Sequence, residues 1–153
     1  MANMIQYAKE QVSRVIAQAY EKAAAAGALP GGVAVKGTVE IPKDPKNGDY
    51  AASFAMAGAK AMKMAPRAIA QALVDHMDLG DTPFASVEIA GPGFLNFRLG
   101  HRWYGQVLSA IESEGALYGQ SQEGQGKRVM VEFVSANPTG PMHMGNARGG
   151  VLG

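Results

Sequence analysis

One stretch near the carboxyl end constrains the fold most, because a strand-like run, a proline-rich loop and a helix start follow one another there. Residues 129–135 are apolar and rich in β-branched side chains, which predicts a buried strand. Residues 137–141 contain two prolines and a glycine, which interrupt both strand ladders and helices. A helix starting after such a loop directs free N–H groups and the positive end of its dipole at an anion. The stretch therefore predicts a nucleotide-binding loop.

The residues that follow this loop resemble a known signature. His143-Met144-Gly145-Asn146 is similar to the His-x-Gly-His signature of class I aminoacyl-tRNA synthetases. The flanks, Glu132 to Pro141 in front and Arg148-Gly149 behind, resemble arginyl-tRNA synthetases in particular. The short signature alone is weak evidence, so the resemblance depends on the extended stretch in this order.

The composition excludes several classes of site. A net charge of +1 gives no overall attraction to nucleic acid, so any RNA contact must come from a local basic surface. The absence of cysteine excludes disulfides and thiolate metal sites, and with three histidines we expect no metal site. No apolar run approaches the roughly 18 residues of a membrane span. The N-terminus also lacks the features of a signal peptide, so we expect a cytoplasmic protein without membrane contact.

The first half of the chain reads as three helices and a short strand. Apolar residues recur at three- and four-residue steps over residues 3–26, which predicts an amphipathic helix. Residues 38–41 alternate like a half-buried strand. Asp49 is a plausible N-cap for a second helix over residues 50–64, and Pro66 suits the first turn of a third helix.

Alternating runs at 85–89 and 94–99 flank a glycine-containing turn, which predicts a β-hairpin. A fourth helix is expected over residues 101–114, with its apolar residues on one side. Together these elements predict an α+β fold, with helices packed on a small antiparallel sheet. The apolar positions of the fourth helix are Trp103, Val107, Leu108 and Ile111.

A segment rich in glycine, serine and glutamine separates two parts of the chain. We predict an N-terminal domain over residues 1–120 and a linker over 121–128. Residues 129–153 are then the start of a second domain. The resemblance implies that the first part is the family's N-terminal domain, which contacts the D-loop of tRNA. It also implies that the second part is the first strand and loop of a truncated Rossmann-like catalytic domain. The pieces of the first part that carry the resemblance are 48–51, Pro66 with Ile69-Ala70, and 90–97.

Phe94, Asn96 and Arg98 share one face of the second hairpin strand, because side chains alternate along a strand. A stacking group, an amide and a cation can read an unstacked base beside a phosphate. From spacing alone, one packed aromatic residue and two solvated polar residues would be the simpler interpretation. The resemblance favours the other one, and it implies that the three residues bind tRNA.

The resemblance also implies roles in ATP binding. Class I enzymes transfer an adenylyl group from ATP, used with Mg²⁺, to the amino-acid carboxylate, and charge develops on phosphate oxygens. His143 and Asn146 would be the catalytic donors to these oxygens, and Gly145 would leave room for the nucleotide. Asn146 departs from the family's usual histidine, since an amide donates hydrogen bonds but carries no charge.

Residues at the end of the expected strand are candidates for binding arginine, because open α/β sheets bind ligands at the carboxyl ends of their strands. By resemblance these are Glu132, Ser135 and Asn137, together with His143. Ser135 and Asn137 are also common turn residues that need no ligand. The alternative for Glu132 is an ion pair with Arg148.

The resemblance implies that the chain is part of an arginine–tRNA ligase, which activates arginine with ATP and esterifies the 3′ adenosine of tRNA-Arg. Family members usually need bound tRNA before they activate arginine. The expected partners are tRNA-Arg, arginine and ATP, and the full-length enzyme is expected to be a monomer. The 153 residues alone are expected to be inactive. Two alternatives remain, an RNA-binding module without catalysis and another class I-like nucleotidyl-transferring enzyme.

Overall fold

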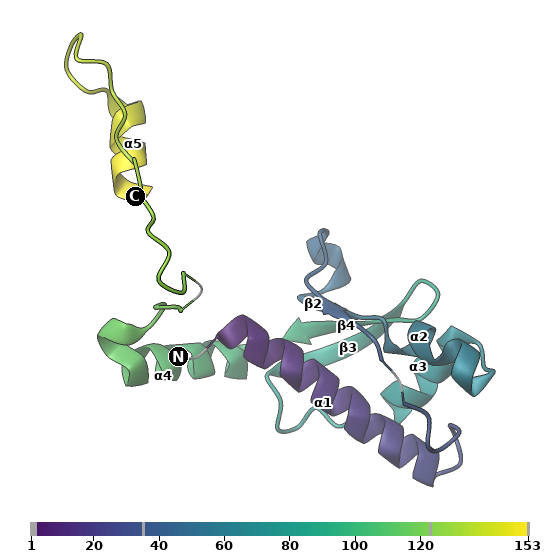
Figure 1. Ribbon diagram of the computed structural model, residues 1–153. Helices are drawn as coiled ribbons and strands as arrows, with labels where there is room; N and C mark the ends of the chain where they lie inside the picture. Colours follow the sequence, from purple (N-terminus) through teal and green to yellow (C-terminus); the bar gives the residue numbers. More distant parts are fainter. Residues whose placement is uncertain (1–2, 35, 123, 153) are drawn as a thin grey trace. The chain divides into compact units, whose positions relative to one another are not determined.

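The computed structural model describes residues 3–34, 36–122 and 124–152 (Figure 1). The chain divides into two compact units, Met1–Gly119 and Gln120–Gly153, and each is considered by itself. Among the described residues, ten helices and strands lie in the first unit and one helix, α5 (Met144–Leu152), in the second. Within the described ranges, no helix is both long enough and apolar enough to cross a membrane.

The first unit is built on a four-stranded antiparallel sheet with the strand order β1-β2-β4-β3. The two long strands form the hairpin that the alternating runs predict, with Val87 opposite Phe97 and Ile89 opposite Leu95. The order places β2 between β1 and β4, so the central pairing joins segments far apart in the sequence. The strands are β1 (Val39–Glu40), β2 (Tyr50–Ala52), β3 (Phe84–Ala90) and β4 (Phe94–Leu99).

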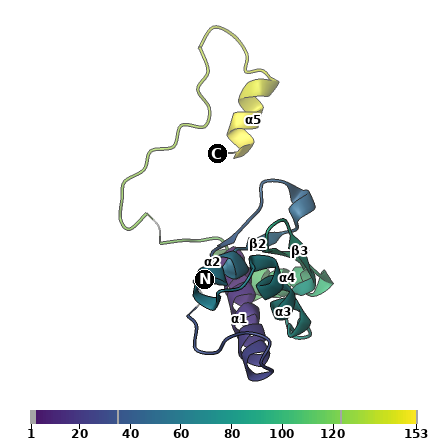
Figure 2. The same ribbon diagram turned by 90° about the vertical axis from the view of Figure 1, so that its right-hand side faces the viewer.

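Three helices, α1 (Met4–Ala25), α2 (Phe54–Met62) and α3 (Pro66–Asp75), pack against the sheet and against one another. In Figure 2, α1 and α3 extend below the strands, and the loop that carries the short helix η1 (Pro45–Asn47) rises above them. The α1 helix begins as predicted, because the Asn3 side chain accepts a hydrogen bond of 3.0 Å from the Gln6 N–H. These elements confirm the α+β fold class.

The core lies between the sheet and these helices. Its centre is aromatic, with the Phe97 ring 5.2 Å from that of Phe84, and the Phe84 ring 6.2 Å from that of Tyr50. The buried positions of α1 recur every three or four residues, as the apolar period predicts. They are Ala8, Val12, Val15, Ile16, Ala19 and Ala23.

The helix predicted over residues 50–64 is wrong in its first turn. Tyr50–Ala52 is strand β2, paired with β1 and β4, and α2 begins only at Phe54. Asp49 is therefore not a helix cap, and its carboxylate instead accepts a hydrogen bond of 2.7 Å from the Leu99 N–H. Pairing on both sides and complete burial of these three residues outweigh the helix propensity of an alanine-rich run.

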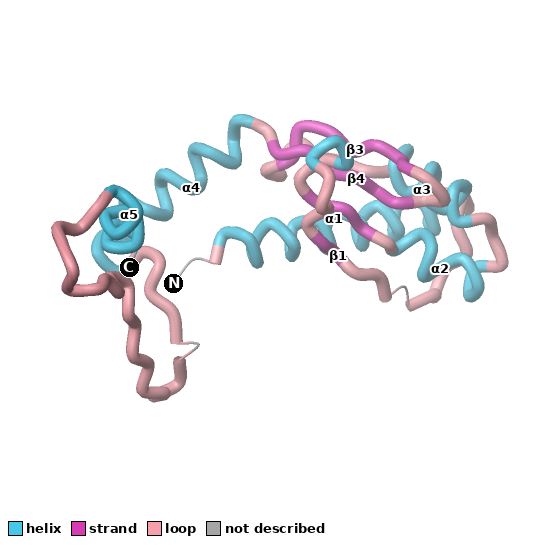
Figure 3. The backbone as a smooth tube through the Cα atoms, turned by 90° about the horizontal axis from the view of Figure 1, so that it is seen from above, coloured by secondary structure: helices cyan, strands magenta, loops and turns pink. Residues whose placement is uncertain are grey.

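The helix α4 (His101–Glu114) has the predicted bounds, and a short helix, η2 (Gly115–Leu117), follows it. Its apolar side is less buried than the pattern suggests. In Figure 3, α4 runs away from the strands, and none of its residues is buried. Trp103 packs against the core, whereas Leu108 is 61% exposed and Ile111 is 39% exposed.

The prediction of a strand over residues 129–135 is also wrong. These residues form no ladder with any part of the chain that the structure describes, and all of them are exposed. An extended segment becomes a strand only when at least one neighbouring strand forms backbone hydrogen bonds with it. The apolar pattern is compatible with a buried strand, but no segment that the structure describes pairs with residues 129–135.

Burial raises the pKa of the Tyr50 hydroxyl above its ordinary value of 10.0, and the charge of Asp49 adds to the shift. Because the pKa of Tyr50 is higher in the folded state than in the unfolded state, the protonated hydroxyl contributes stability. This contribution is complete below about pH 10 and is lost as the pH rises through the folded-state pKa. We expect the free energy of unfolding to fall more steeply above pH 10 in the native chain than in Tyr50→Phe. Urea unfolding followed from pH 8 to 11 would measure both slopes, and equal slopes would contradict the expectation.

Candidate functional site

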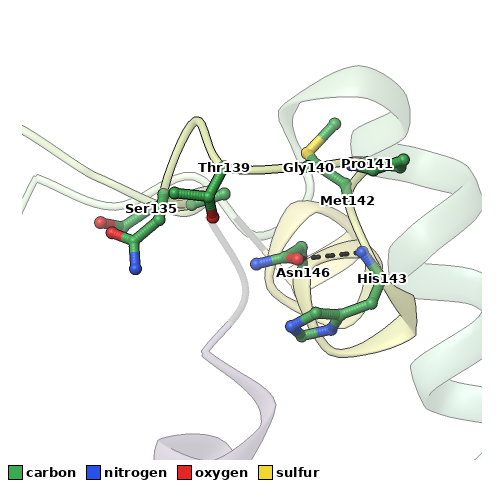
Figure 4. Close-up of a pocket in the computed structure, with 9 residues that line it drawn as sticks. Ser135, Thr139, Gly140, Pro141, Met142, His143 and Asn146 are labelled. Atoms are coloured by element: carbon green, nitrogen blue, oxygen red, sulfur yellow. Dashed lines mark hydrogen bonds between the residues drawn. The ribbon is translucent and has the colours of Figure 1, made fainter.

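The loop in front of α5 surrounds a cavity of about 320 Å³ (Figure 4). Four of the residues expected to bind ligands line it together, namely Ser135, Asn137, His143 and Asn146. Thr139 lines it as well, although the sequence reasoning did not single it out. The only feature of the sequence that could have indicated Thr139 as a lining residue is its hydroxyl group within the proline-rich loop.

Two local hydrogen bonds hold the side chains of His143 and Asn146 at the start of α5. The His143 Nδ1 accepts a hydrogen bond of 3.0 Å from the Gly145 N–H. The Asn146 Oδ1 accepts one of 3.1 Å from the His143 N–H, drawn as a dashed line in Figure 4. The Asn146 bond is the same as that of the glutamate in a capping box, whereas His143 accepts from the N–H two residues on instead of three. Both side chains are therefore held at the helix start.

The capping bonds determine which atoms are left for a ligand. A neutral imidazole that accepts at Nδ1 carries its proton on Nε2, so the Nε2–H of His143 is a donor without a partner in the loop. The Oδ1 of Asn146 is occupied, which leaves its Nδ2–H₂ group as a second donor. Two N–H donors at the positive end of a helix dipole suit an anionic oxygen, such as one of a phosphate group.

Glycines allow α5 to lie directly on the extended segment before the loop. A Cβ atom at Gly149 would be 2.6 Å from the Phe133 carbonyl oxygen, and one at Gly150 would be 3.3 Å from the Val134 Cγ2. At Gly145, a Cβ would meet the His143 ring at 2.9 Å. An extended segment, a loop and a helix packed back on it form the predicted layout, although the segment is not paired as a strand.

Glu132 and Gly145 lie outside the lining of this cavity. Glu132 is exposed, and no ion pair joins it to Arg148 or to any other side chain that the structure describes. The alternative in which Arg148 is its partner is therefore wrong for this structure. No group of three or more potential metal-binding side chains occurs within the described ranges.

The second candidate region is the face of the sheet that points away from the helices. Residues paired across the strands form one row in the order Glu40, Ala51, Asn96 and Glu88. Directly paired residues of an antiparallel sheet point to the same side. Asn96 therefore shares this face with its neighbours at alternate positions of β4, which are Phe94 and Arg98.

A cavity of about 300 Å³ opens on this face between the η1 loop and the hairpin turn. Phe94 and Asn96 line it, but Arg98 does not. The Arg98 Nη2 instead donates a hydrogen bond of 2.8 Å to the Lys46 carbonyl oxygen, and its Nε lies 3.9 Å from Glu88 Oε1. The structure thus joins two of the three predicted RNA-binding residues in one cavity, while the third holds the η1 loop in place.

Asn96 is the most informative residue of the sheet cavity. It is only 7% exposed, yet its side-chain amide forms no hydrogen bond with any residue that the structure describes. The amide atoms of Asn96 are not among the fully buried side-chain atoms without a partner, so they reach the cavity, where water or a ligand can hydrogen-bond to them. An amide that lacks a protein partner and lines a cavity can pair with a ligand there.

Comparisons of the chain with protein families and with curated proteins give the same result. Residues 8–99 match the family described as "Arginyl tRNA synthetase N terminal domain". The chain is 46% identical over 153 residues to the arginine–tRNA ligase of Acetivibrio thermocellus, covering 100% of this chain and 27% of that protein. It is 47% identical over 150 residues to the arginine–tRNA ligase of Symbiobacterium thermophilum, covering 98% of this chain and 27% of that protein.

The fold has a counterpart among solved structures. The crystal structure of arginyl-tRNA synthetase from Plasmodium falciparum superposes with a TM-score of 0.53 at 13% sequence identity, covering 67% of this chain and 18% of that chain. This likeness supports the fold alone. The chain spans about a quarter of the length of the curated relatives it matches, since it covers 27% of each of the two described above.

Proposed function

Because the chain belongs to the arginyl-tRNA synthetase family, we propose that the whole protein is a cytoplasmic, monomeric arginine–tRNA ligase. In this proposal, residues 1–120 form a tRNA-contacting domain, 121–128 a linker, and 129–153 the start of the catalytic domain. The observation that carries it is the loop cavity, in which four polar residues of the extended signature meet at the start of α5. The 153 residues by themselves are expected to be inactive.

The proposed reaction joins arginine to ATP and then to tRNA. A carboxylate oxygen of arginine attacks the α-phosphorus of ATP, supplied with Mg²⁺, and pyrophosphate leaves. Negative charge develops on the phosphate oxygens, and donors held in place beforehand stabilise it most. We assign this role to the free N–H groups of His143 and Asn146, which the capping bonds hold rigidly.

The remaining loop residues are assigned to substrate binding. Gly145 keeps the space beside the His143 ring open for the nucleotide, since a Cβ there would be 2.9 Å from His143 Cε1. Ser135 and Asn137 are proposed to bind the α-amino and carboxylate groups of arginine, together with His143. Glu132 completes the proposed set, and its exposed carboxylate is free of ion pairs within the described ranges.

The sheet cavity is proposed to bind one unstacked base of the D-loop of tRNA-Arg. Phe94 offers a ring for stacking, and the Asn96 amide offers both a donor and an acceptor for the edge of a base. Arg98 contributes by holding the η1 loop against the cavity through the Lys46 carbonyl. Residues 8–99, which match the N-terminal domain of the family, include most of the residues of this face.

A salt series with tRNA-Arg and an unrelated tRNA tests this proposal. We expect the chain to prefer tRNA-Arg and its affinity to fall as salt rises, because phosphate contacts release counterions. Phe94→Ala with Asn96→Ala should lower the affinity for tRNA-Arg about tenfold or more, since stacking contributes roughly 1–3 kcal/mol per base. Fluorescence anisotropy with labelled tRNA would measure both effects.

The outcomes separate the proposed function from its nearest alternative. Equal binding to both tRNAs, unaffected by the double substitution, would contradict a base-reading cavity. Preferential binding by the chain, combined with a full-length protein that forms no arginyl-adenylate, would favour an RNA-binding module without catalysis.

A further inference from the structure

The sheet cavity has a carboxylate at one side that its assignment to RNA binding does not explain. Glu40 lines the cavity together with Asn96, and the two lie in the same row, separated by Ala51. Two strand spacings of about 4.8 Å place them roughly 10 Å apart. Because Ala51 is small, the floor between the carboxylate and the amide is open.

Glu40 differs from the second carboxylate of this row. Glu88 lies on the other side of Asn96, outside the cavity lining, and its Oε1 is 3.9 Å from the Arg98 Nε. No side chain that the structure describes forms an ion pair or hydrogen bond with the carboxylate of Glu40, which is exposed. The cavity therefore contains an unpaired acceptor beside an unpaired amide.

An unpaired carboxylate is unfavourable on a surface that approaches phosphates, because the charges repel. It becomes favourable only where the ligand presents hydrogen-bond donors to it, since a carboxylate accepts and never donates. Adenine, cytosine and guanine carry an exocyclic amino group that donates such bonds. Uracil presents two carbonyl oxygens and a single N–H, so most of its edge would face Glu40 with acceptors.

We propose that Glu40 is a specificity-determining residue that makes the cavity select an unpaired base with an exocyclic amino group and reject uracil. In this arrangement Phe94 stacks on the base, Asn96 pairs with one part of its edge, and Glu40 accepts from the amino group. The proposal rests on the proposed tRNA-binding role of Phe94 and Asn96, and it adds the chemical class of base that they bind.

Nucleoside titrations of the ¹⁵N-labelled chain test the selection directly. Adenosine, cytidine and uridine would each be added while the side-chain amide signals of Asn96 are followed by NMR. We expect adenosine and cytidine to bind about tenfold more tightly than uridine, because a good pairing with a base edge gives about that much discrimination. Glu40→Gln keeps the size of the side chain but adds a donor, so its preference should fall to within about twofold.

Glu88→Gln is the matched control, because it removes a carboxylate from the same row but outside the cavity. It should keep the tenfold preference. Equal binding of the three nucleosides, or a preference that survives Glu40→Gln, would overturn the role of Glu40 while leaving the cavity as a base-binding site. If no nucleoside shifts the Asn96 amide signals, the base-binding role itself is wrong, and the proposal for Glu40 is wrong with it.

Discussion

Replacing Phe97 with alanine is expected to lower the free energy of unfolding of the first unit by about 3–5 kcal/mol. Phe97 is fully buried at 0% exposure, in the strand that pairs with both β2 and β3. Its ring packs against Phe84 in the aromatic centre of the core. Removing the ring loses its transfer free energy and leaves a cavity that the surrounding strands can close only in part.

Such a loss is large compared with the total stability of a small domain, which is typically about 5–15 kcal/mol. Urea unfolding followed by far-ultraviolet circular dichroism would measure it. Phe94→Ala is the matched control, since it removes the same side chain from the same strand on the opposite, partly exposed face. We expect that variant to lose much less stability. Equal losses in the two variants would show that burial does not distinguish the two faces of β4.

The hairpin and the first helix could be predicted from the sequence because their patterns are local and strong. The alternation around Gly91-Pro92-Gly93 is sufficient to define both strands and their faces, since side chains alternate along a strand. In α1, a cap at Asn3 and an unbroken apolar period determine the start and the buried side. Neither element depends on residues far away in the sequence.

The strand β2 could not be predicted in the same way. Its three residues, Tyr50–Ala52, lie in front of an alanine-rich run, so local propensity favours helix. Their strand conformation depends on pairing with Leu95 and Phe97, more than 40 residues away. The opposite error occurs at residues 129–135, where the pattern is strong but no described segment supplies a pairing partner.

The two candidate sites differ in how well the sequence predicts them, because their residues lie at different distances along the chain. The residues of the loop cavity lie within 12 positions of one another, from Ser135 to Asn146, so their order along the chain already indicates that they are close. In the sheet cavity, Glu40 and Asn96 line the same space only because β2 pairs with β1 on one side and with β4 on the other. The sequence therefore indicated Phe94 and Asn96 but gave no sign that Glu40 lies beside them. The binding roles of all these residues remain predictions.

The largest functional effect is expected for His143→Ala in the full-length protein. The loss of one preorganised donor to a developing anion typically lowers kcat about 10²–10³-fold. We therefore expect arginine-dependent ATP–pyrophosphate exchange, measured with tRNA-Arg present, to fall by that factor. His101→Ala is the control, because His101 is exposed at the start of α4, lies outside both cavities, and its side chain forms no hydrogen bond within the described ranges.

Alanine at position 143 removes two things, the cap of α5 and the free Nε2–H group, and a further variant can separate them. Asparagine is a good N-cap residue, so His143→Asn should preserve the helix start, but its shorter amide cannot occupy the position of the imidazole Nε2. If the donor carries the rate, His143→Asn should remain strongly impaired while the amide protons of α5 exchange as slowly as in the native protein. Recovery of native exchange activity in His143→Asn would mean that the capping bond to Gly145, and not the donor, accounts for the role of His143.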